Sequence, residues 1–190
     1  MELSTVTPGP EGLRALSHPM RLRMLGLLRV EGPATATTLA QRLGLNTGAT
    51  SYHLRQLAQH GFIEDDPERG NARDRWWRAS HSATQANPAE ARTDEEHDTY
   101  DALLQAVAVV YANNLQRALE QRRTLPSDWA EAGTFSDWIL LLTPERAAEL
   151  KDAIKELLEG FVEDQEGTPG ALPFMVNVNA YVQPDVADRA

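Results

Sequence analysis

Residues 47–56 combine hydroxyl, amide, aromatic and guanidinium side chains, which are the groups that contact base edges and phosphates. Thr50, Leu54 and Leu57 recur at three- and four-residue steps within the same segment. This period predicts a helix with one buried face, which leaves the other side chains free to contact a ligand. The residues that we expect to contact DNA from this helix are Thr47, Gly48, Ser51, Tyr52, His53, Arg55 and Gln56.

The residues before this segment predict the helices and turns that position it. A helix begins at Pro19, because proline favours the first helical position. Thr35 is placed to cap a second helix, and Gly44 supplies the tight turn that ends it. Asn46 then opens the next helix, which Gly61 ends in the C′ position. Two helices joined by so short a turn predict a helix-turn-helix motif.

A hairpin rich in arginine follows the motif. Residues 62–65 and 76–79 predict two short strands around a polar loop that contains glycine. We expect this wing to bind the phosphate backbone or the adjacent minor groove through Arg69, Arg73 and Arg75. The alternative for Arg75 is to close the hairpin, and for His53 it is to pack against the wing or the helix.

Four segments of the chain resemble the ArsR-type family of bacterial winged helix-turn-helix regulators over roughly residues 10–79. They are His18-Pro19-Met20-Arg21-Leu22, Leu39-Ala40, Ser51-Tyr52-His53-Leu54-Arg55-Gln56-Leu57 and Gly61-Phe62-Ile63. The resemblance implies a homodimeric transcription factor, usually a repressor, that binds a pseudo-palindromic operator. The chain departs from the family in lacking the thiolates of its metal sites and in carrying a pair of tryptophans, Trp76 and Trp77, on the second wing strand.

Composition and charge narrow the function classes. The chain has 190 residues and no cysteine, which excludes disulfides and thiolate zinc sites. No segment predicts a membrane span or a signal peptide, so we expect a cytoplasmic protein. No nucleophile triad or glycine-rich phosphate loop is present, so we expect neither an enzyme nor a cofactor.

The net charge of −10 is unevenly distributed. Residues 11–79 hold ten arginines against seven acidic residues, whereas residues 80–190 hold eight basic against twenty acidic residues. A local basic excess suffices for DNA binding, because only the contacting face must neutralise phosphates. We therefore expect double-stranded DNA as the partner of the first part and the acidic part to face away from it.

The second half of the chain predicts a linker and then a long helix. Residues 80–93 are small and polar, whereas apolar residues recur at helical spacing for about 30 residues after Thr93. So long an apolar stripe needs a partner, and a second copy of the chain is the simplest one. The residues that we expect at this dimer interface are Leu103, Leu104, Val107, Val110, Tyr111 and Leu115.

The last segment predicts a strand, a helix and a strand. Residues 135–142 and 174–182 are apolar and favour strands, and Thr143-Pro144 opens a helix between them. The predicted fold is mainly α with small β: a winged helix-turn-helix domain, a long dimerisation helix and a strand–helix–strand module. The expected divisions are a flexible N-terminus (1–9), the DNA-binding domain (10–79), a linker (80–93) and a dimerisation or effector domain (94–190).

One further group of side chains could bind a metal. Asp94, His97, Asp98 and Asp101 lie near the start of the long helix, and His97 and Asp101 share a face. The simpler interpretation is an acidic helix N-terminus with one incidental histidine, so we expect no metal. The alternative function is a sensor whose second domain binds a metal or an unidentified small-molecule effector that changes the affinity for DNA.

Overall fold

The computed structural model describes residues 4–69, 74–165 and 167–184. The chain forms two compact units, residues 1–122 and 123–190. The helices of the first unit are α1 (Pro10–Leu16), α2 (Pro19–Val30), α3 (Ala36–Leu43), α4 (Thr47–Gln59) and α5 (Asp94–Gln121), with a 3-10 turn η1 (Pro88–Glu90). Its strands are β1 (Thr5–Val6), β2 (Ala34–Thr35), β3 (Ile63–Asp65), β4 (Trp76–Ala79) and β5 (Ala83–Thr84). A second 3-10 turn, η2 (Arg122–Thr124), leads to α6 (Ser127–Ala132) and α7 (Pro144–Glu159) of the second unit.

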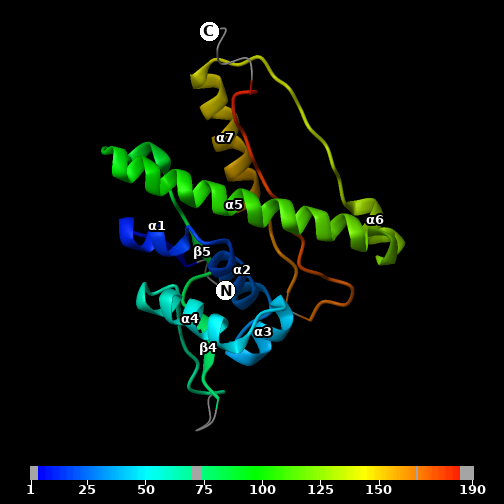
Figure 1. Ribbon diagram of the computed structural model, residues 1–190. Helices are drawn as coiled ribbons and strands as arrows, with labels where there is room; N and C mark the ends of the chain where they lie inside the picture. Colours follow the sequence, from blue (N-terminus) through cyan, green and yellow to red (C-terminus); the bar gives the residue numbers. More distant parts are fainter. Residues whose placement is uncertain (1–3, 70–73, 166, 185–190) are drawn as a thin grey trace. The chain divides into compact units, whose positions relative to one another are not determined.

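The core of the first unit lies between its helices. In Figure 1, α5 runs across the side of this unit where α1 and α2 lie, and α4 and β4 lie away from it. Leu54 and Leu57 of α4 are fully buried together with Met24 and Leu25 of α2. This confirms the predicted buried face of residues 47–59. Burial of each such side chain contributes about 1.5–3 kcal/mol, so packing fixes the orientation of α4.

The turns of the helix-turn-helix motif match the sequence prediction. The Thr35 hydroxyl accepts a hydrogen bond from the Thr38 N–H at 3.1 Å, and Gly44 ends α3 with a φ of 67°. The side-chain oxygen of Asn46 accepts a bond from the Ala49 N–H at 2.8 Å, which caps α4. Gly61, with a φ of 73°, turns the chain out of α4. Only glycine adopts these left-handed conformations without strain, so the two glycines fix the ends of both helices.

A three-stranded sheet of order β2–β4–β3 forms the base of the wing. The two strands predicted from the sequence are present as β3 and β4, which pair antiparallel with Glu64 opposite Arg78. The third strand, Ala34–Thr35, was not predicted. Two residues are too few to produce an alternating pattern, and their pairing with Trp76 and Trp77 depends on a distant part of the chain.

Parts of the expected flexible N-terminus and of the expected linker form a two-stranded sheet. Thr5 and Val6 of β1 pair in parallel with Ala83 and Thr84 of β5. Arg29 of α2 holds β5 by donating to the His81 carbonyl at 2.9 Å and to the Thr84 hydroxyl at 2.8 Å. Burial lowers the pKa of Arg29. These contacts join segments far apart in the sequence, so local composition could not predict them.

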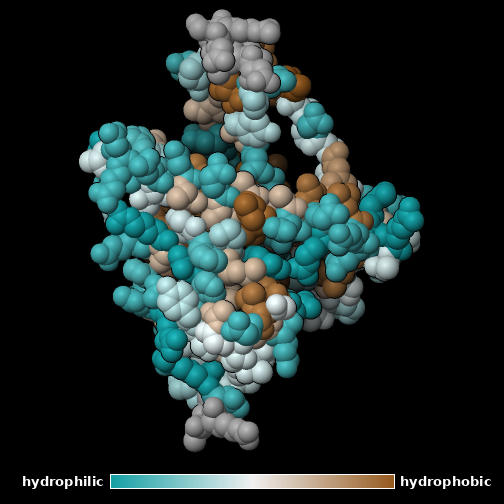
Figure 2. Space-filling model, viewed as in Figure 1, coloured by the Kyte–Doolittle hydropathy of each residue, from teal (hydrophilic) through white to brown (hydrophobic). Residues whose placement is uncertain are grey.

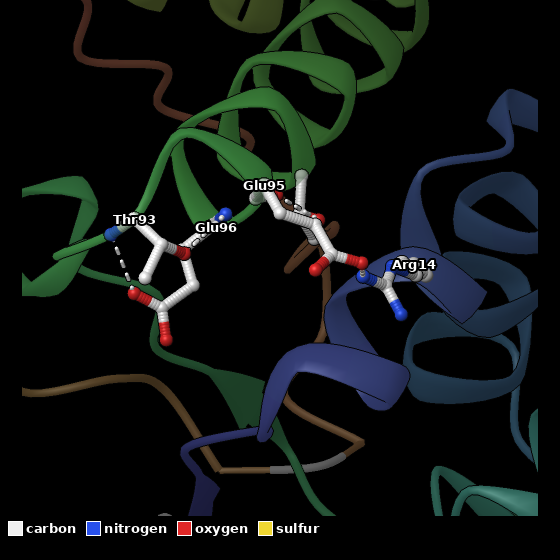
Figure 3. Close-up of polar contacts among 5 residues, drawn as sticks. Arg14, Thr93, Glu95 and Glu96 are labelled. Atoms are coloured by element: carbon white, nitrogen blue, oxygen red, sulfur yellow. Dashed lines mark hydrogen bonds and ion pairs between the residues drawn. The ribbon is translucent and has the colours of Figure 1, made fainter.

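Helix α5 is part of the first unit, whereas the sequence placed a domain boundary before it. Thr93 and Glu96 form a capping box at its start, and the Arg14 guanidinium of α1 pairs with the Glu95 carboxylate (Figure 3). Tyr100 and Leu103 are buried in the core that α1 and α2 also form. The boundary between the units lies instead between Arg122 and Arg123. A helical period shows that a face is covered but not which part of the chain covers it.

The second unit contains helices but not the two predicted strands. Residues 144–159 form α7 with Thr143 as its cap, as predicted. Residues 135–142 and 174–182 are extended without pairing, so these two strand predictions are wrong for this structure. A strand is defined by its hydrogen-bonded neighbour, and a suitable side-chain pattern does not supply one. The fold class, mainly α with small β, is confirmed. None of the described helices combines the length and the apolar character needed to cross a membrane.

Candidate nucleic-acid interface

One face of α4 is open and carries the side chains expected to contact DNA. Thr47, Gly48, Tyr52 and Arg55 are exposed, while Ser51, His53 and Gln56 are half-buried. The opposite face is fixed in the core by Leu54, Leu57 and the fully buried Thr50. The Thr50 hydroxyl donates to the Asn46 carbonyl at 3.1 Å, so this buried polar group is satisfied. The result is a rigid helix with a polar outer face, which is the geometry of a recognition helix.

Two histidines and an arginine lie behind this face, where α2 begins. The rings of His18 and His53 are 4.6 Å apart, and the His18 Nδ1 accepts a hydrogen bond from the Met20 N–H at 3.1 Å. The Arg21 guanidinium donates to the carbonyls of Ala15 and Arg14. Arg21 therefore ties α2 to the end of α1.

The surroundings of His18 and His53 lower the pKa of both side chains. Burial lowers the pKa of His18, and the Arg21 charge lowers it further. Burial also lowers the pKa of His53, with contributions from His18 and Arg21. The His53 Nδ1 is buried and has no hydrogen-bond partner among the described residues. These contacts favour the packing role for His53, whose ring lies against His18 as well as Tyr52.

The arginines of the wing differ in how strongly their charges are already paired. Arg75 makes two bonds to the Asp65 carboxylate, one of them 2.6 Å long, and its guanidinium lies 4.1 Å from the ring centre of Trp77. The hydrogen bonds from Arg75 lower the pKa of Asp65. Arg75 thus closes the hairpin in this structure, which matches the alternative that the sequence left open.

Arg69 is held more loosely than Arg75. Its Nε lies 3.9 Å from the Asp66 carboxylate, and its guanidinium is 6.0 Å from the ring centre of Trp76. Both distances are at the outer limit of their interactions, so the exposed Arg69 side chain can turn toward another anion. Arg73 lies outside the described residues.

Sequence reasoning missed the acidic partners of the wing arginines. Arg78 pairs with Glu64 at 2.9 Å, and Arg75 pairs with Asp65. The strand register, which places Glu64 directly opposite Arg78, was the signal that could have found the first pair. Both pairs reduce the positive charge that the wing presents.

The side chains predicted for the dimer interface lie on different faces of α5. Leu103 is 5% exposed and belongs to the core of its own unit, so its assignment to the interface is corrected. Val107 is half-buried against the same core. Leu104 and Leu115 are 49% and 48% exposed and remain open for a partner. Val110 and Tyr111 are half-buried. The apolar stripe therefore has one part that packs internally and one part that is uncovered.

The acidic residues around His97 occupy the first turns of α5. Asp94, His97, Asp98 and Asp101 are all exposed. Across residues 4–69, 74–165 and 167–184, no group of three or more histidine, cysteine or acidic side chains has the arrangement of a metal site.

One family model matches part of the first unit, and two solved structures show a low similarity to the chain. Residues 16–66 match the family model of a helix-turn-helix domain. A double mutant of Lactococcus lactis ZitR in its apo form has 14% sequence identity and a TM-score of 0.32, over 73% of this chain and 81% of that one. The disulfide form of AbfR has 16% identity and a TM-score of 0.26, over 74% and 69% of the two chains. No curated protein matches the chain. The family match, together with the geometry of α3 and α4, shows that the chain carries a helix-turn-helix domain of the kind found in DNA-binding transcriptional regulators.

Proposed function

We propose that this protein is a homodimeric transcriptional repressor of the ArsR type, which binds a pseudo-palindromic operator. The observation that carries the proposal is the outer face of α4, where the exposed Thr47, Tyr52 and Arg55 surround Ser51 on a helix fixed by its buried side. An α-helix fits the major groove of DNA, and these side chains can donate to or accept from base edges there. No enzymatic step is part of the proposal.

The proposed roles of the residues that contact DNA follow from the charge and the exposure of their side chains. The exposed Thr47, Tyr52 and Arg55 of α4 read the base edges, with Arg55 as the cation of this face. Arg69 binds a phosphate beside the groove, because its pairing with Asp66 is weak. Arg75 enters this interface only if it leaves Asp65. Arg73 is proposed to contact DNA from the wing because of its position in the sequence.

The proposed dimer forms through the uncovered part of α5. Leu104, Tyr111 and Leu115 are spaced by seven and four residues, which places them along one side of the helix. This side lies away from Leu103, which packs into the core. Two copies of α5 packed along this side would relate their α4 helices by a two-fold axis, as a pseudo-palindromic operator requires.

The test is to recover the operator. Full-length protein is incubated with sheared genomic DNA of its source organism, and the retained fragments are sequenced. We expect inverted repeats whose half-site centres are about 10–10.5 base pairs, or a multiple of that, apart. A double variant, Tyr52→Ala with Arg55→Ala, serves as the matched control and should retain no specific fragments. Retention of random fragments at low salt by both proteins would contradict the proposal.

The sign of regulation needs a separate measurement. Deletion of the gene should raise the transcript level of the genes beside the recovered operator, because a bound repressor blocks their transcription. A fall in those transcripts would make the protein an activator and would leave the proposed DNA contacts untouched.

A further inference from the structure

The second unit has no core of its own. None of its described residues, 123–165 and 167–184, is buried, although it contains many large apolar side chains. Ile139 is 78% exposed and Leu141 is fully exposed. Figure 2 shows hydrophobic side chains along the extended segment between α6 and α7. A unit that buries so little apolar surface requires a partner to cover it.

The two extended segments have the side-chain composition of strands. In residues 174–182, apolar side chains at even positions alternate with methionine, asparagine and tyrosine, which is typical of a strand covered on one face. In residues 135–142, apolar side chains occupy both alternating sets, which is typical of a central strand covered on both faces. The main chain of residues 137–142 makes no hydrogen bond to any described residue. Such groups are an open edge for another strand.

Helix α7 has a matching apolar face. Leu150, Ile154, Leu157 and Leu158 recur at helical spacing, and all but the half-buried Ile154 are exposed. Six of the eight charged side chains of α7 form pairs within the helix: Arg146 with Glu149, Lys151 with Asp152 and Lys155 with Glu159. Glu145 and Glu156 leave the helix with a net charge of −2, so its apolar side chains, rather than a strong charge, offer a surface to a partner.

We propose that residues 135–142 and 174–182 are strands of one intermolecular sheet, completed by a second copy of this chain, with α7 of each copy packed on the sheet. The inference extends the proposed homodimer by a second interface, and it does not depend on DNA binding. Residues 135–142 of the two copies form the central antiparallel pair across the two-fold axis, and residues 174–182 form the outer strands.

A second copy fits this surface better than a foreign protein for three reasons. Residues 174–182 carry no charge and residues 135–142 carry only Asp137, so these two segments match an uncharged strand such as the same segment of a second copy. The chain supplies both layers of a two-layer fold, a helix face and strand edges. Two copies supply four strand segments, above the three that an independently stable sheet needs.

Closure within one chain is the competing arrangement. In this structure the two segments do not pair. Figure 1 shows the segment before α7 running clear of residues 174–182 over most of its length. The central position of residues 135–142 is then filled by the same segment of the other copy, which gives the isologous contact of a two-fold dimer.

Single-cysteine cross-linking tests the proposal without DNA. The natural chain has no cysteine, so any cross-linked dimer must join the introduced residues of two copies. Full-length single variants Asp137→Cys, Trp138→Cys, Ile139→Cys and Leu140→Cys are treated with a short bifunctional maleimide. We expect at least one of them to form covalent dimers in high yield. Asp152→Cys, on the charged side of α7 that points away from the sheet, is the matched control and should stay monomeric in denaturing gels.

Amide hydrogen exchange then separates a strand ladder from simple apolar contact. In the parent, exchange of residues 137–142 should slow by about tenfold or more when the protein concentration is raised through the dimerisation range. Leu141→Asp should abolish this protection and leave exchange in α4 unchanged. Val30→Asp, a charge on an exposed apolar site of α2, should behave as the parent.

Three results would overturn the inference. One is a dimer in which no cysteine of residues 137–140 cross-links. Another is protection of residues 137–142 that is the same at all concentrations, which would mean closure within one chain. The third is a protein that stays monomeric at high concentration. A failure to retain operator DNA would instead affect only the proposed function.

Discussion

The exposed Arg55 of α4 and the paired Arg75 of the wing should differ in their effect on the salt dependence of DNA binding. Arg55 is exposed on the proposed recognition face, and no described residue forms an ion pair with its guanidinium. Arg75 is held by two bonds to Asp65 and by Trp77. We therefore compare Arg55→Gln, which removes one charge, with the charge-neutral double variant Asp65→Asn with Arg75→Gln.

The expected size of the effect follows from counterion release. If Arg55 contacts one phosphate in each copy, its loss from a dimer lowers the slope of log K against log salt by about 1.8. Over a fourfold rise in salt the parent would then lose about 12-fold more affinity than the variant. If Arg55 contacts a base instead, the variant loses about 1–3 kcal/mol and relaxes the preference at one position. The double variant should keep the parent slope.

The assay is fluorescence anisotropy with the recovered operator at several salt concentrations, together with a mutated operator for specificity. An Arg55→Gln protein with the parent slope, affinity and specificity would refute the placement of the DNA face on α4. If the slope of log K against log salt falls in the double variant as much as is expected for Arg55→Gln, then Arg75 leaves Asp65 to bind phosphate.

Three further predictions concern stability, assembly and metals. Burial lowers the pKa of His18 and His53, so the unfolded chain binds protons before the folded chain does as the pH falls below about 6.5. The free energy of unfolding should therefore decrease below this pH, by at most about 1.4 kcal/mol per pH unit for each histidine, and stay constant above this pH. Urea unfolding at several pH values checks this, and a His18→Asn, His53→Gln variant that keeps the full slope would contradict it. Leu115→Asp should weaken dimerisation in ultracentrifugation with a normal free energy of unfolding, whereas Leu103→Ala should lower that free energy by about 2–5 kcal/mol. A Leu115→Asp protein that dimerises like the parent would contradict the first role, and an unchanged stability of Leu103→Ala would contradict the second. The affinity for DNA should be the same with a chelator and with micromolar zinc, nickel or cobalt, and the same in His97→Ala, because carboxylates beside one histidine bind such metals weakly. A tenfold metal-dependent change in this affinity, about 1.4 kcal/mol, that is lost in His97→Ala would make the protein a metal sensor.

The sequence alone determined the helix-turn-helix motif, because local chemistry sets its boundaries. The side chains of Thr35 and Asn46 cap helices wherever the fold places them, and Gly44 and Gly61 end helices through a conformation that few other residues adopt. The period of Thr50, Leu54 and Leu57 likewise identified the buried face of α4. From this face the exposed residues of the proposed DNA site followed directly.

Only the tertiary structure decided which partner each remaining surface has. The period of α5 predicted a covered face, but the structure shows that Leu103 is covered by the core of its own chain and Leu115 is not. The apolar pattern of residues 135–142 favoured a strand, yet no described segment of the chain pairs with it. Pairing between β1 and β5, and between Arg75 and Asp65, joins residues whose proximity depends on the whole fold. The physical reason is that capping and periodicity are local, whereas burial and strand pairing are contacts between segments that a one-dimensional pattern does not bring together.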